Sequence, residues 1–303
     1  MNHSTHNSSK KKISLTLSKA SDGFIKFKIA EGLSHRTIES YEYYLWQWIE
    51  KVGDQDCSNI RTSDLVDYLA WLRTDYKPKR WNGNKAPYSP KSLKNAYTAL
   101  KSFFNWLTME FNLENPFVNI PPPKFPTQSV EIFTKEEIEK LLKACVYSRE
   151  VNPSNRRSFV MRRPSGDRDK AILLTLLDTG MRAGEICSLL VEDLDQKTGK
   201  IRIKQGMSGG AKGGKGRTVF LGKVARKAVW LYLAKREDGD DPTAPLFTSH
   251  HDRPFNRNSL RILVRRLGER AEVPKVHPHK FRHIFATTYL RSGGDIFTLQ
   301  ALL

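Results

Sequence analysis

The first part of the chain carries hydrophobic side chains at helical spacing. From position 34 onward, apolar residues recur every three or four positions, at Ile38, Tyr41, Leu45, Trp48 and Val52. Side chains with this spacing share one face of a helix, so the pattern predicts a helix that begins at Ser34 as its N-cap. Ser63 is predicted to cap a second helix, whose apolar positions are Leu65, Tyr68, Leu69 and Leu72.

A third helix is predicted from Ser89 and Pro90, because proline is favoured in the first turn of a helix. Its apolar positions are Leu93, Tyr97, Leu100, Phe104 and Leu107. We interpret this aromatic stripe as the core of a small helical bundle. The alternative interpretation is a surface on which nucleic-acid bases stack.

A stretch rich in proline and asparagine divides the chain. The segment NPFVNIPPPKFPTQ at 115–128 has few charges and disfavours helix, so it predicts a semi-rigid linker. We therefore expect a disordered basic arm over residues 1–14, a helical domain over 15–110, a linker over 111–130 and a second domain over 131–303.

The second domain mixes helical and alternating patterns. Thr134 and Glu137 form a capping-box pair before its first helix, and the polar residues 148–167 predict a long loop. KIRIK at 200–204 and RTVFL at 217–221 alternate as a β-hairpin does. Further helices are predicted over 169–179, 182–190, 223–236, 256–272 and 278–291, with another start near Asp295. The predicted fold is mainly α in two domains, the second an α+β domain with a small antiparallel sheet.

Charge and size suggest a polyanionic partner. The formal net charge of the 303 residues is +19, of which residues 1–110 carry +6 and residues 131–303 carry +13. Two basic domains could hold a polyanion between them. The alternative interpretation is that the charge only keeps the protein soluble.

The cysteines and the first residues bear on the compartment. Cys57, Cys145 and Cys187 are odd in number and far apart, which argues against a disulfide framework and for a reducing compartment. MNHSTHNSSKKK is not a signal peptide, and no apolar run approaches the length of a membrane span. We therefore expect a cytoplasmic protein.

Three basic segments carry side chains that suit a phosphodiester. Arg182 stands in TGMRAGEI, Lys212 in AKGGKGR, and His279 with Arg282 in HPHKFRH. Two guanidinium groups can hold both non-bridging oxygens of a phosphate, a histidine can transfer a proton near neutral pH, and a lysine can protonate a leaving oxygen. Glu185 lies three residues after Arg182, which makes it a candidate to orient that arginine. Each residue alone reads as a solvated surface charge, but the three segments together indicate a phosphate-processing site.

In this order the segments resemble those of the tyrosine recombinase, or phage integrase, family. The resemblance rests on TGMRAGEICSL, KGGKGR in the hairpin, HPHKFRHIFATTYL and GGDIFTLQALL, and it spans roughly residues 15–303. SHRTIESYEYYLWQWI and SPKSLKNAYTALKSFFNWL, which precede the linker, resemble that family's core-binding domain. Together these segments are specific for the family, whereas each segment alone is only moderately specific for it.

The resemblance implies roles for individual residues. Arg182 matches the first catalytic arginine, Lys212 the hairpin lysine that protonates the leaving 5′-hydroxyl, and His279 with Arg282 the His-x-x-Arg pair. Within the hairpin, Lys215 is the alternative to Lys212. Supporting positions of the same segments are matched by Glu185 and His283.

The family's reaction needs no metal and no nucleotide, so the resemblance implies no cofactor. A tyrosine hydroxyl attacks a phosphodiester of double-stranded DNA and forms a 3′-phosphotyrosyl link, which a second DNA end reverses within a tetramer. The family's Gly-His or Gly-Trp box and its tyrosine follow the segment that matches FTLQALL, beyond Leu303. Tyr289 shares the predicted helix of Arg282, where a packing role is expected. We therefore expect this chain to bind DNA without cleaving it, and to self-associate on DNA more weakly than a complete member of the family does.

Two other functional classes remain as alternatives. A non-catalytic DNA-binding protein could occupy sites or modulate an active relative, and a phosphotransferase or nuclease could use the same arginines with water as the nucleophile. The DNA contacts expected from charge are Arg36, Lys77, Lys79, Arg80, Lys91, Lys94, Lys215 and Arg217.

Two other signals are discounted. The segment 209–216 lacks the hydroxyl residue of a phosphate-binding P-loop and precedes a strand rather than a helix. His277, His279 and His283 have no further ligand nearby in the sequence, so we expect no metal site.

Overall fold

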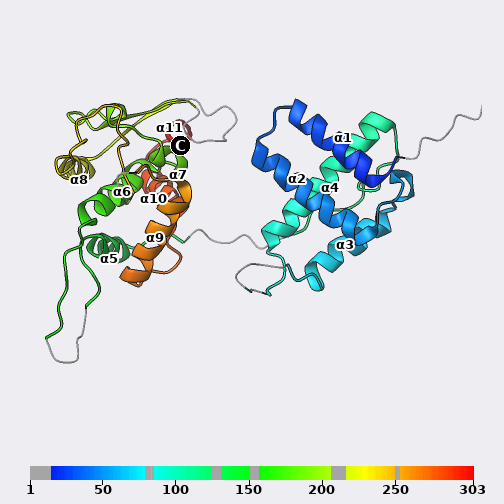
Figure 1. Ribbon diagram of the computed structural model, residues 1–303, viewed down its shortest axis with the longest axis horizontal. Coiled ribbons are helices and arrows are strands. Elements are labelled where there is room, and N and C mark those ends of the chain that lie inside the picture. Colours follow the sequence, from blue (N-terminus) through cyan, green and yellow to red (C-terminus); the bar gives the residue numbers. More distant parts are fainter. Residues whose placement is uncertain are drawn as a thin grey trace, which may run out of the picture. The chain divides into compact units, whose positions relative to one another are not determined.

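The chain folds into two compact units, residues 1–128 and 129–303 (Figure 1). The computed structural model describes residues 15–78, 83, 85–124, 131–150, 157–205, 216–249 and 253–303. The predicted arm at 1–14 lies outside the described residues, as do Lys79, Arg80, Lys212 and Lys215. No helix in the described part of the chain is long and apolar enough to cross a membrane.

The first unit is a bundle of helices. Its elements are α1 (Leu17–Ala30), α2 (His35–Val52), the 3-10 turn η1 (Cys57–Asn59), α3 (Thr62–Thr74) and α4 (Pro90–Phe111). The predicted cap at Ser34 is confirmed, because its side chain accepts a hydrogen bond from the backbone N–H of Thr37. The third helix begins where it was predicted, with Pro90 in the first turn, and the side chain of Ser89 accepts a hydrogen bond from the N–H of Ser92. The predicted cap at Ser63 is wrong. The helix α3 begins at Thr62, because the carboxylate of Asp64 accepts a hydrogen bond from the N–H of Arg61.

The aromatic stripe of α4 forms the core of this unit. Leu93, Tyr97, Leu100, Phe104 and Leu107 are all buried, together with Trp48 of α2 and Phe24 of α1. The rings of Trp48 and Phe104 meet edge to face with centroids 5.4 Å apart. The stripe is therefore core, and the base-stacking interpretation is wrong for it.

The first half of the predicted linker packs onto the bundle. Phe117 and Ile120 are buried, and the hydroxyl of Tyr97 donates a hydrogen bond of 2.7 Å to the carbonyl of Ile120. Asn112 adopts a left-handed conformation that ends α4 and turns the chain back over the core. The tripeptide Pro121–Pro123 follows this packed segment.

The second unit surrounds its core with helices and one small sheet. Its elements are α5 (Lys135–Val146), α6 (Gly166–Thr179), α7 (Ala183–Cys187), the 3-10 turn η2 (Val191–Asp193), β1 (Lys200–Ile203), β2 (Arg217–Phe220), α8 (Lys223–Leu233), α9 (Arg257–Ala271), α10 (Pro278–Arg291) and α11 (Ile296–Leu302). Thr134 and Glu137 form the predicted capping box. The fold is mainly α with a two-stranded sheet, as the sequence predicts.

The sheet and the central helix build the second core. The strands β1 and β2 pair antiparallel, with Ile201 opposite Val219, and both side chains are buried. The helix α6 is buried on most of its surface and packs against α5, α8 and α10. At the start of the second unit, Phe133 meets Phe281 of α10 edge to face. The ammonium group of the buried Lys280 lies 4.2 Å from the centroid of the Phe133 ring.

The segment predicted as a long loop after α5 contains a paired ribbon. Tyr147 and Arg162 form an antiparallel bridge, the N–H of Ser148 donates to the carbonyl of Met161, and the N–H of Arg163 donates to that of Val146. We call residues 147–150 and 157–163 the ribbon arm. It extends out from the second unit between α5 and α6 (Figure 1).

Candidate functional site

The first arginine of the site is positioned by a helix end. Gly180 ends α6 in a left-handed conformation, with a φ of 59°, and its N–H donates to the carbonyl of Leu176. The chain then turns into α7, for which Arg182 is the N-cap. A side chain at Gly180 would meet Phe285 of α10, because a Cβ there would lie 2.7 Å from the Phe285 Cδ1. Glycine at this position therefore lets α6, α7 and α10 approach one another.

A buried carboxylate fixes the orientation of Arg182. Glu185 is only 2% exposed, and its Oε1 accepts a hydrogen bond of 3.0 Å from Arg182 Nη1. Its Oε2 accepts one of 2.8 Å from the backbone N–H of Arg182. The prediction that Glu185 orients Arg182 agrees with this geometry. The Arg182 side chain is 45% exposed, so the guanidinium is held from one side and accessible from the other.

Arg217 of β2 is the second arginine that binds the carboxylate of Glu185. Its Nη1 and Nη2 donate to the two carboxylate oxygens of Glu185 at 2.8 and 2.7 Å, and its Nε donates to the carbonyl of Leu302. Burial opposes ionisation of Glu185, but the hydrogen bonds from Arg217 and Arg182 outweigh it and lower its pKa. The expectation that Arg217 contacts DNA is wrong for this geometry, because its guanidinium is occupied inside the protein and is mostly buried.

The helix α10 brings the second arginine and the histidine to the same region. His277 is the N-cap of α10, its Nδ1 accepts a hydrogen bond from the N–H of Lys280, and Pro278 occupies the first turn. The Nη1 of Arg282 donates a hydrogen bond of 3.0 Å to the carbonyl of Gly180, and its Nη2 donates to the carbonyl of Leu303. The same glycine that precedes Arg182 therefore anchors Arg282.

The positive charges of the site affect one another. Burial and the nearby charge of Arg182 lower the pKa of Arg282 to about 10, so this guanidinium remains protonated at neutral pH. Burial lowers the pKa of His279 as well, and the charges of His283, Arg282 and Arg182 add to this effect. The rings of His279 and His283 meet edge to face, with centroids 4.5 Å apart. Bringing like charges together in this way favours an anionic ligand, which would relieve their repulsion.

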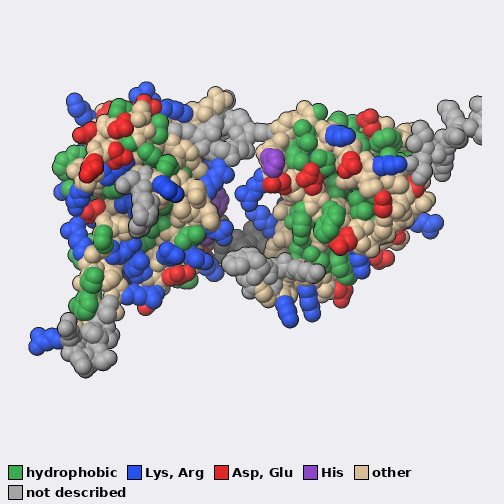
Figure 2. Space-filling view, in the orientation of Figure 1, with side chains coloured by type: hydrophobic (Ala, Val, Ile, Leu, Met, Phe, Trp, Pro, Cys, Tyr) green, Lys and Arg blue, Asp and Glu red, His purple; other side chains and the backbone are tan. Residues whose placement is uncertain are grey.

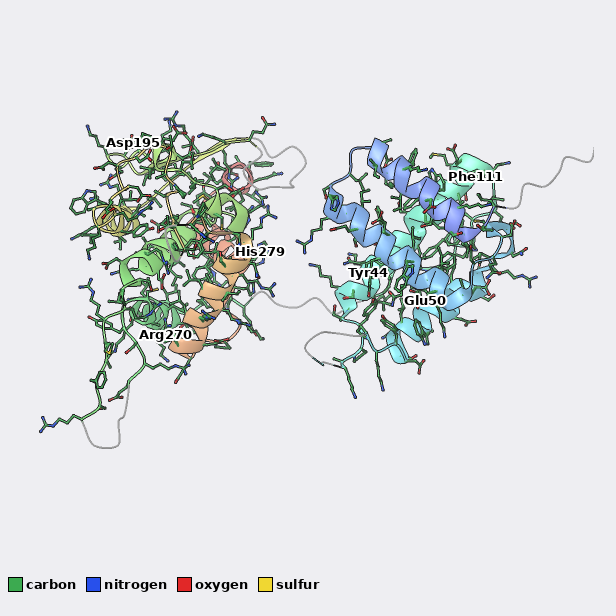
Figure 3. The ribbon with its side chains drawn as sticks, in the orientation of Figure 1. Tyr44, Glu50, Phe111, Asp195, Arg270 and His279 are labelled. Atoms are coloured by element: carbon green, nitrogen blue, oxygen red, sulfur yellow. The ribbon has the colours of Figure 1, made fainter. Side chains whose placement is uncertain are left out.

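His279 lies at the surface of the second unit, near α9 (Figure 3). Its ring is accessible while Lys280, the next residue, is buried. Among the described residues, the structure contains no group of three His, Cys, Asp or Glu side chains that could hold a metal ion. The arrangement can therefore bind an anion through two guanidinium groups, with an imidazole that gains or loses a proton near neutral pH.

We predict that His279 titrates below its ordinary pKa of 6.5 in the free protein. Because the folded protein binds this proton less well than the unfolded chain, folding stability should fall as the pH drops below about 6.5. An NMR titration of the His279 ring measures the midpoint directly. Replacing Arg282 by Gln should raise the midpoint, since one neighbouring positive charge is lost. A midpoint at or above 6.5 in the unmodified protein would contradict the prediction.

The remaining predicted DNA contacts that the structure describes belong to the first unit. Arg36 of α2, Lys91 and Lys94 of α4 and Lys77 are all exposed in the first unit. A chain of hydrogen bonds holds the segment that precedes α4: the hydroxyls of Tyr43 and Tyr88 are 3.0 Å apart, and Tyr88 donates to the Oε1 of Gln47. The four basic residues remain predictions for DNA contacts.

The sequence did not predict the structural roles of two residues at the site. Gly180 directly follows the helix predicted over 169–179, but its anchoring of Arg282 depends on a contact across 102 residues. Arg217 was assigned to DNA, whereas it supports Glu185. The sequence contains one hint for Arg217: it stands two residues before the apolar Val219 in RTVFL, so the two side chains share one face of the strand.

Comparison with known families gives matches to both parts of the chain. The model described as "Phage integrase family" matches residues 131–303, and the model described as "Phage integrase, N-terminal SAM-like domain" matches residues 22–110.

Relatives match over most of their length. Tyrosine recombinase XerA of Thermococcus kodakarensis is 30% identical over 273 residues, which cover 90% of this chain and 82% of the relative. Tyrosine recombinase XerD of Halalkalibacterium halodurans is 30% identical over 294 residues, which cover 92% of this chain and 87% of the relative.

Solved structures share the fold. The Tn1549 transposon integrase in complex with transposon right end DNA aligns with a TM-score of 0.72 and 17% identity, over 95% of this chain and 90% of that one. A lambda integrase dimer bound to a COC′ core site aligns with a TM-score of 0.68 and 16% identity, over 95% of this chain and 94% of that one.

Proposed function

Because the chain belongs to the phage integrase family of tyrosine recombinases, we propose that its second unit holds a DNA phosphodiester for strand transfer between Arg182 and Arg282. The observation that carries the proposal is the convergence of these two arginines and His279 around one helix end. Glu185 and Gly180 fix the two guanidinium groups from behind. Fixed donors directed at a phosphate stabilise charge that develops on its oxygens in the transition state.

The proposed chemistry proceeds through a covalent intermediate. A tyrosine hydroxyl attacks the phosphorus and loses its proton, the bond from phosphorus to the 5′-oxygen breaks, and the 5′-oxygen takes up a proton. Lys212, with Lys215 as the alternative, is proposed to supply the proton to the 5′-oxygen. His279 is proposed to donate a hydrogen bond to a non-bridging oxygen, and His283, whose ring contacts His279, to support it. The resulting 3′-phosphotyrosyl link is reversed by the 5′-hydroxyl of a second DNA end, so the reaction needs no cofactor.

We propose that a polypeptide of residues 1–303 binds its DNA site without cleaving it. No tyrosine hydroxyl bonds to Arg182, His279 or Arg282 in the part of the chain that the structure describes. The ring of Tyr289 stacks on Phe285 and packs closely against Gly294, as a structural residue does. Such a polypeptide would be a site-occupying protein, with double-stranded DNA and further copies of itself as partners.

A nicked suicide substrate tests this proposal. We expect the 303-residue polypeptide to shift the DNA in a native gel and to form no product that survives boiling in detergent. A covalent adduct in this assay would show that a nucleophile is present within residues 1–303. Loss of all binding, specific and non-specific, would contradict the proposed function itself.

Removing Arg282 should weaken DNA binding strongly. A hydrogen bond to a charged group contributes about 1.5–3 kcal/mol, so Arg282→Ala should lower the affinity roughly 10- to 100-fold. The slope of log affinity against log salt should become shallower by about one, because one phosphate contact is lost. Fluorescence anisotropy over a series of salt concentrations measures both quantities.

Two variants control this measurement. Arg282→Lys keeps the charge but loses the planar fork of donors, so it should recover part of the salt slope and little of the affinity. Lys140→Ala removes an exposed charge on α5 and should leave both quantities nearly unchanged. Equal losses for Arg282→Ala and Lys140→Ala would place Arg282 outside the phosphate site.

A further inference from the structure

The ribbon arm presents apolar side chains to solvent. Tyr147, Phe159, Val160 and Met161 are all exposed, Met161 by 57%. A two-stranded ribbon without cover is only marginally stable in water, and such exposed apolar groups commonly mark an interaction surface. The ribbon arm therefore carries the features of a segment that binds a partner.

Both faces of the ribbon arm carry exposed side chains that could contact a partner. Alternate residues of a strand point to opposite faces, so Phe159 and Met161 lie on one face while Val160 and Arg162 lie on the other. Arg157 is exposed and has no partner among the described residues. Between positions 147 and 163 the sequence has five arginines and a single acidic residue, Glu150. The partner surface should therefore be acidic and should contain an apolar anchor.

The first unit offers a surface with these properties. Glu39, Glu42, Trp46 and Glu50 are exposed on α2 at spacings of three and four, and so they form one stripe along the helix. Trp46 is 60% exposed at the centre of this stripe. In Figure 2, acidic and hydrophobic side chains lie together over α1 and α2 of this unit. We call these four residues the α2 stripe.

The α2 stripe is unsuited to DNA. It places three carboxylates around a tryptophan in a chain whose net charge is +19, and carboxylates repel phosphate. The basic residues proposed to contact DNA in the first unit, such as Lys91 and Lys94, belong to the first turns of α4. An acidic stripe with a central Trp instead matches a basic ribbon with exposed apolar residues.

We propose that the ribbon arm of one copy of this chain docks on the α2 stripe of a second copy. In this contact Phe159 or Met161 would pack on Trp46, and Arg157 and Arg162 would pair with Glu42 and Glu50. Every copy carries both surfaces, so the contact is head-to-tail and propagates from copy to copy into a ring or an open chain. The ribbon arm leaves the second unit beside α5, whereas the phosphate-holding residues belong to α7 and α10 (Figure 1). The residues of the proposed contact are therefore different from those that hold the phosphate.

Charge reversal in separate copies tests the contact. One variant reverses the arm, with Arg157→Glu and Arg162→Glu, and a second reverses the stripe, with Glu42→Arg and Glu50→Arg. All four side chains are exposed, and Asp167 keeps Lys235 as a partner when Arg162 is replaced. Sedimentation velocity over a range of protein concentrations, with and without DNA, measures self-association.

We expect each variant alone to associate about tenfold or more weakly than the unmodified chain, because like charges then face each other. An equimolar mixture of the two variants should regain association, because each reversed arm meets a reversed stripe and each native arm meets a native stripe. A matched pair, Lys135→Glu with Lys140→Glu, reverses two exposed charges of α5 and should leave association unchanged.

Three results would overturn the proposal. The first is a mixture that does not recover, which includes the case of an arm that contacts the stripe of its own chain. The second is an unmodified chain that stays monomeric at high protein concentration both free and on DNA. The third is an arm variant that loses affinity for a DNA half-site bound by a single copy, which would identify the arm as a DNA contact. Phosphate binding by Arg182 and Arg282 is measured separately on the half-site, so failure of the contact leaves the proposed function intact.

Discussion

Replacing Glu185 by alanine should destabilise the second unit by about 3–5 kcal/mol, because it leaves the mostly buried guanidinium of Arg217 without its counter-charge. Arg217 is 12% exposed in its side chain, and both of its terminal nitrogens donate to Glu185. Without the carboxylate, this guanidinium stays buried, and among the described residues its remaining hydrogen-bond partner is the carbonyl of Leu302. Arg182 loses its orienting contact in the same variant, so DNA affinity should fall together with stability.

Denaturant unfolding of the second unit measures the loss of stability. Glu192→Ala is the matched control, because Glu192 pairs with Lys204 at the surface, with side chains about half exposed. This exposed pair should contribute less than about 1 kcal/mol. If both variants lose the same stability, the carboxylate of Glu185 does not have the structural role described above.

The pH dependence of Glu185 provides a second readout. Its folded-state pKa is lowered, so its contribution to stability is present above the ordinary value of 4.5 and is lost as the pH falls through the folded value. The alanine variant should therefore lose less stability than the unmodified chain between neutral and acidic pH. A parallel loss in the two proteins would contradict this assignment.

Gly180→Ala should be the second most damaging change, costing about 2–5 kcal/mol. A left-handed backbone costs a non-glycine residue roughly 1–2 kcal/mol, and a Cβ 2.7 Å from Phe285 adds about 1–3 kcal/mol of overpacking. The same shift would move the carbonyl that accepts from Arg282, so DNA affinity should fall beyond the effect of stability alone. Calorimetry and half-site binding measure the two effects.

Two further variants separate these contributions. Gly293 has a φ of 82° and nothing within 4 Å of an added Cβ, so Gly293→Ala should show the cost of the backbone alone. Phe285→Leu combined with Gly180→Ala should recover part of the stability, because the shorter side chain makes room. Equal costs at Gly180 and Gly293 would show that the contact with Phe285 is unimportant.

The sequence predicted those elements whose signals are local. Ser34, Ser89 and Thr134 cap helices because a hydroxyl reaches an N–H three residues away, within one turn of chain. The hairpin followed from alternation in KIRIK and RTVFL. At Ser63 two local signals competed, and the carboxylate of Asp64, bonding back to Arg61, decided the start of α3.

The features that sequence reasoning missed depend on distant partners. Glu185 and Arg217 are 32 residues apart, and Arg282 reaches Gly180 across 102 residues, so no local pattern indicates either contact. The ribbon arm pairs a polar, arginine-rich segment that has no alternation of apolar and polar residues. The prolines of the segment led to its prediction as a linker. Its apolar residues Phe117 and Ile120 nevertheless pack into the core of the first unit.

The aromatic contact at Phe133 connects the start of the second unit to α10. Phe133 packs on Phe281 and lies beneath the ammonium group of Lys280, and both of these residues belong to the helix that carries His279 and Arg282. The residues between Ile120 and Phe133 are the chain's only covalent route from one unit to the other. A shift of Phe133 would therefore act directly on α10, through Phe281 and Lys280.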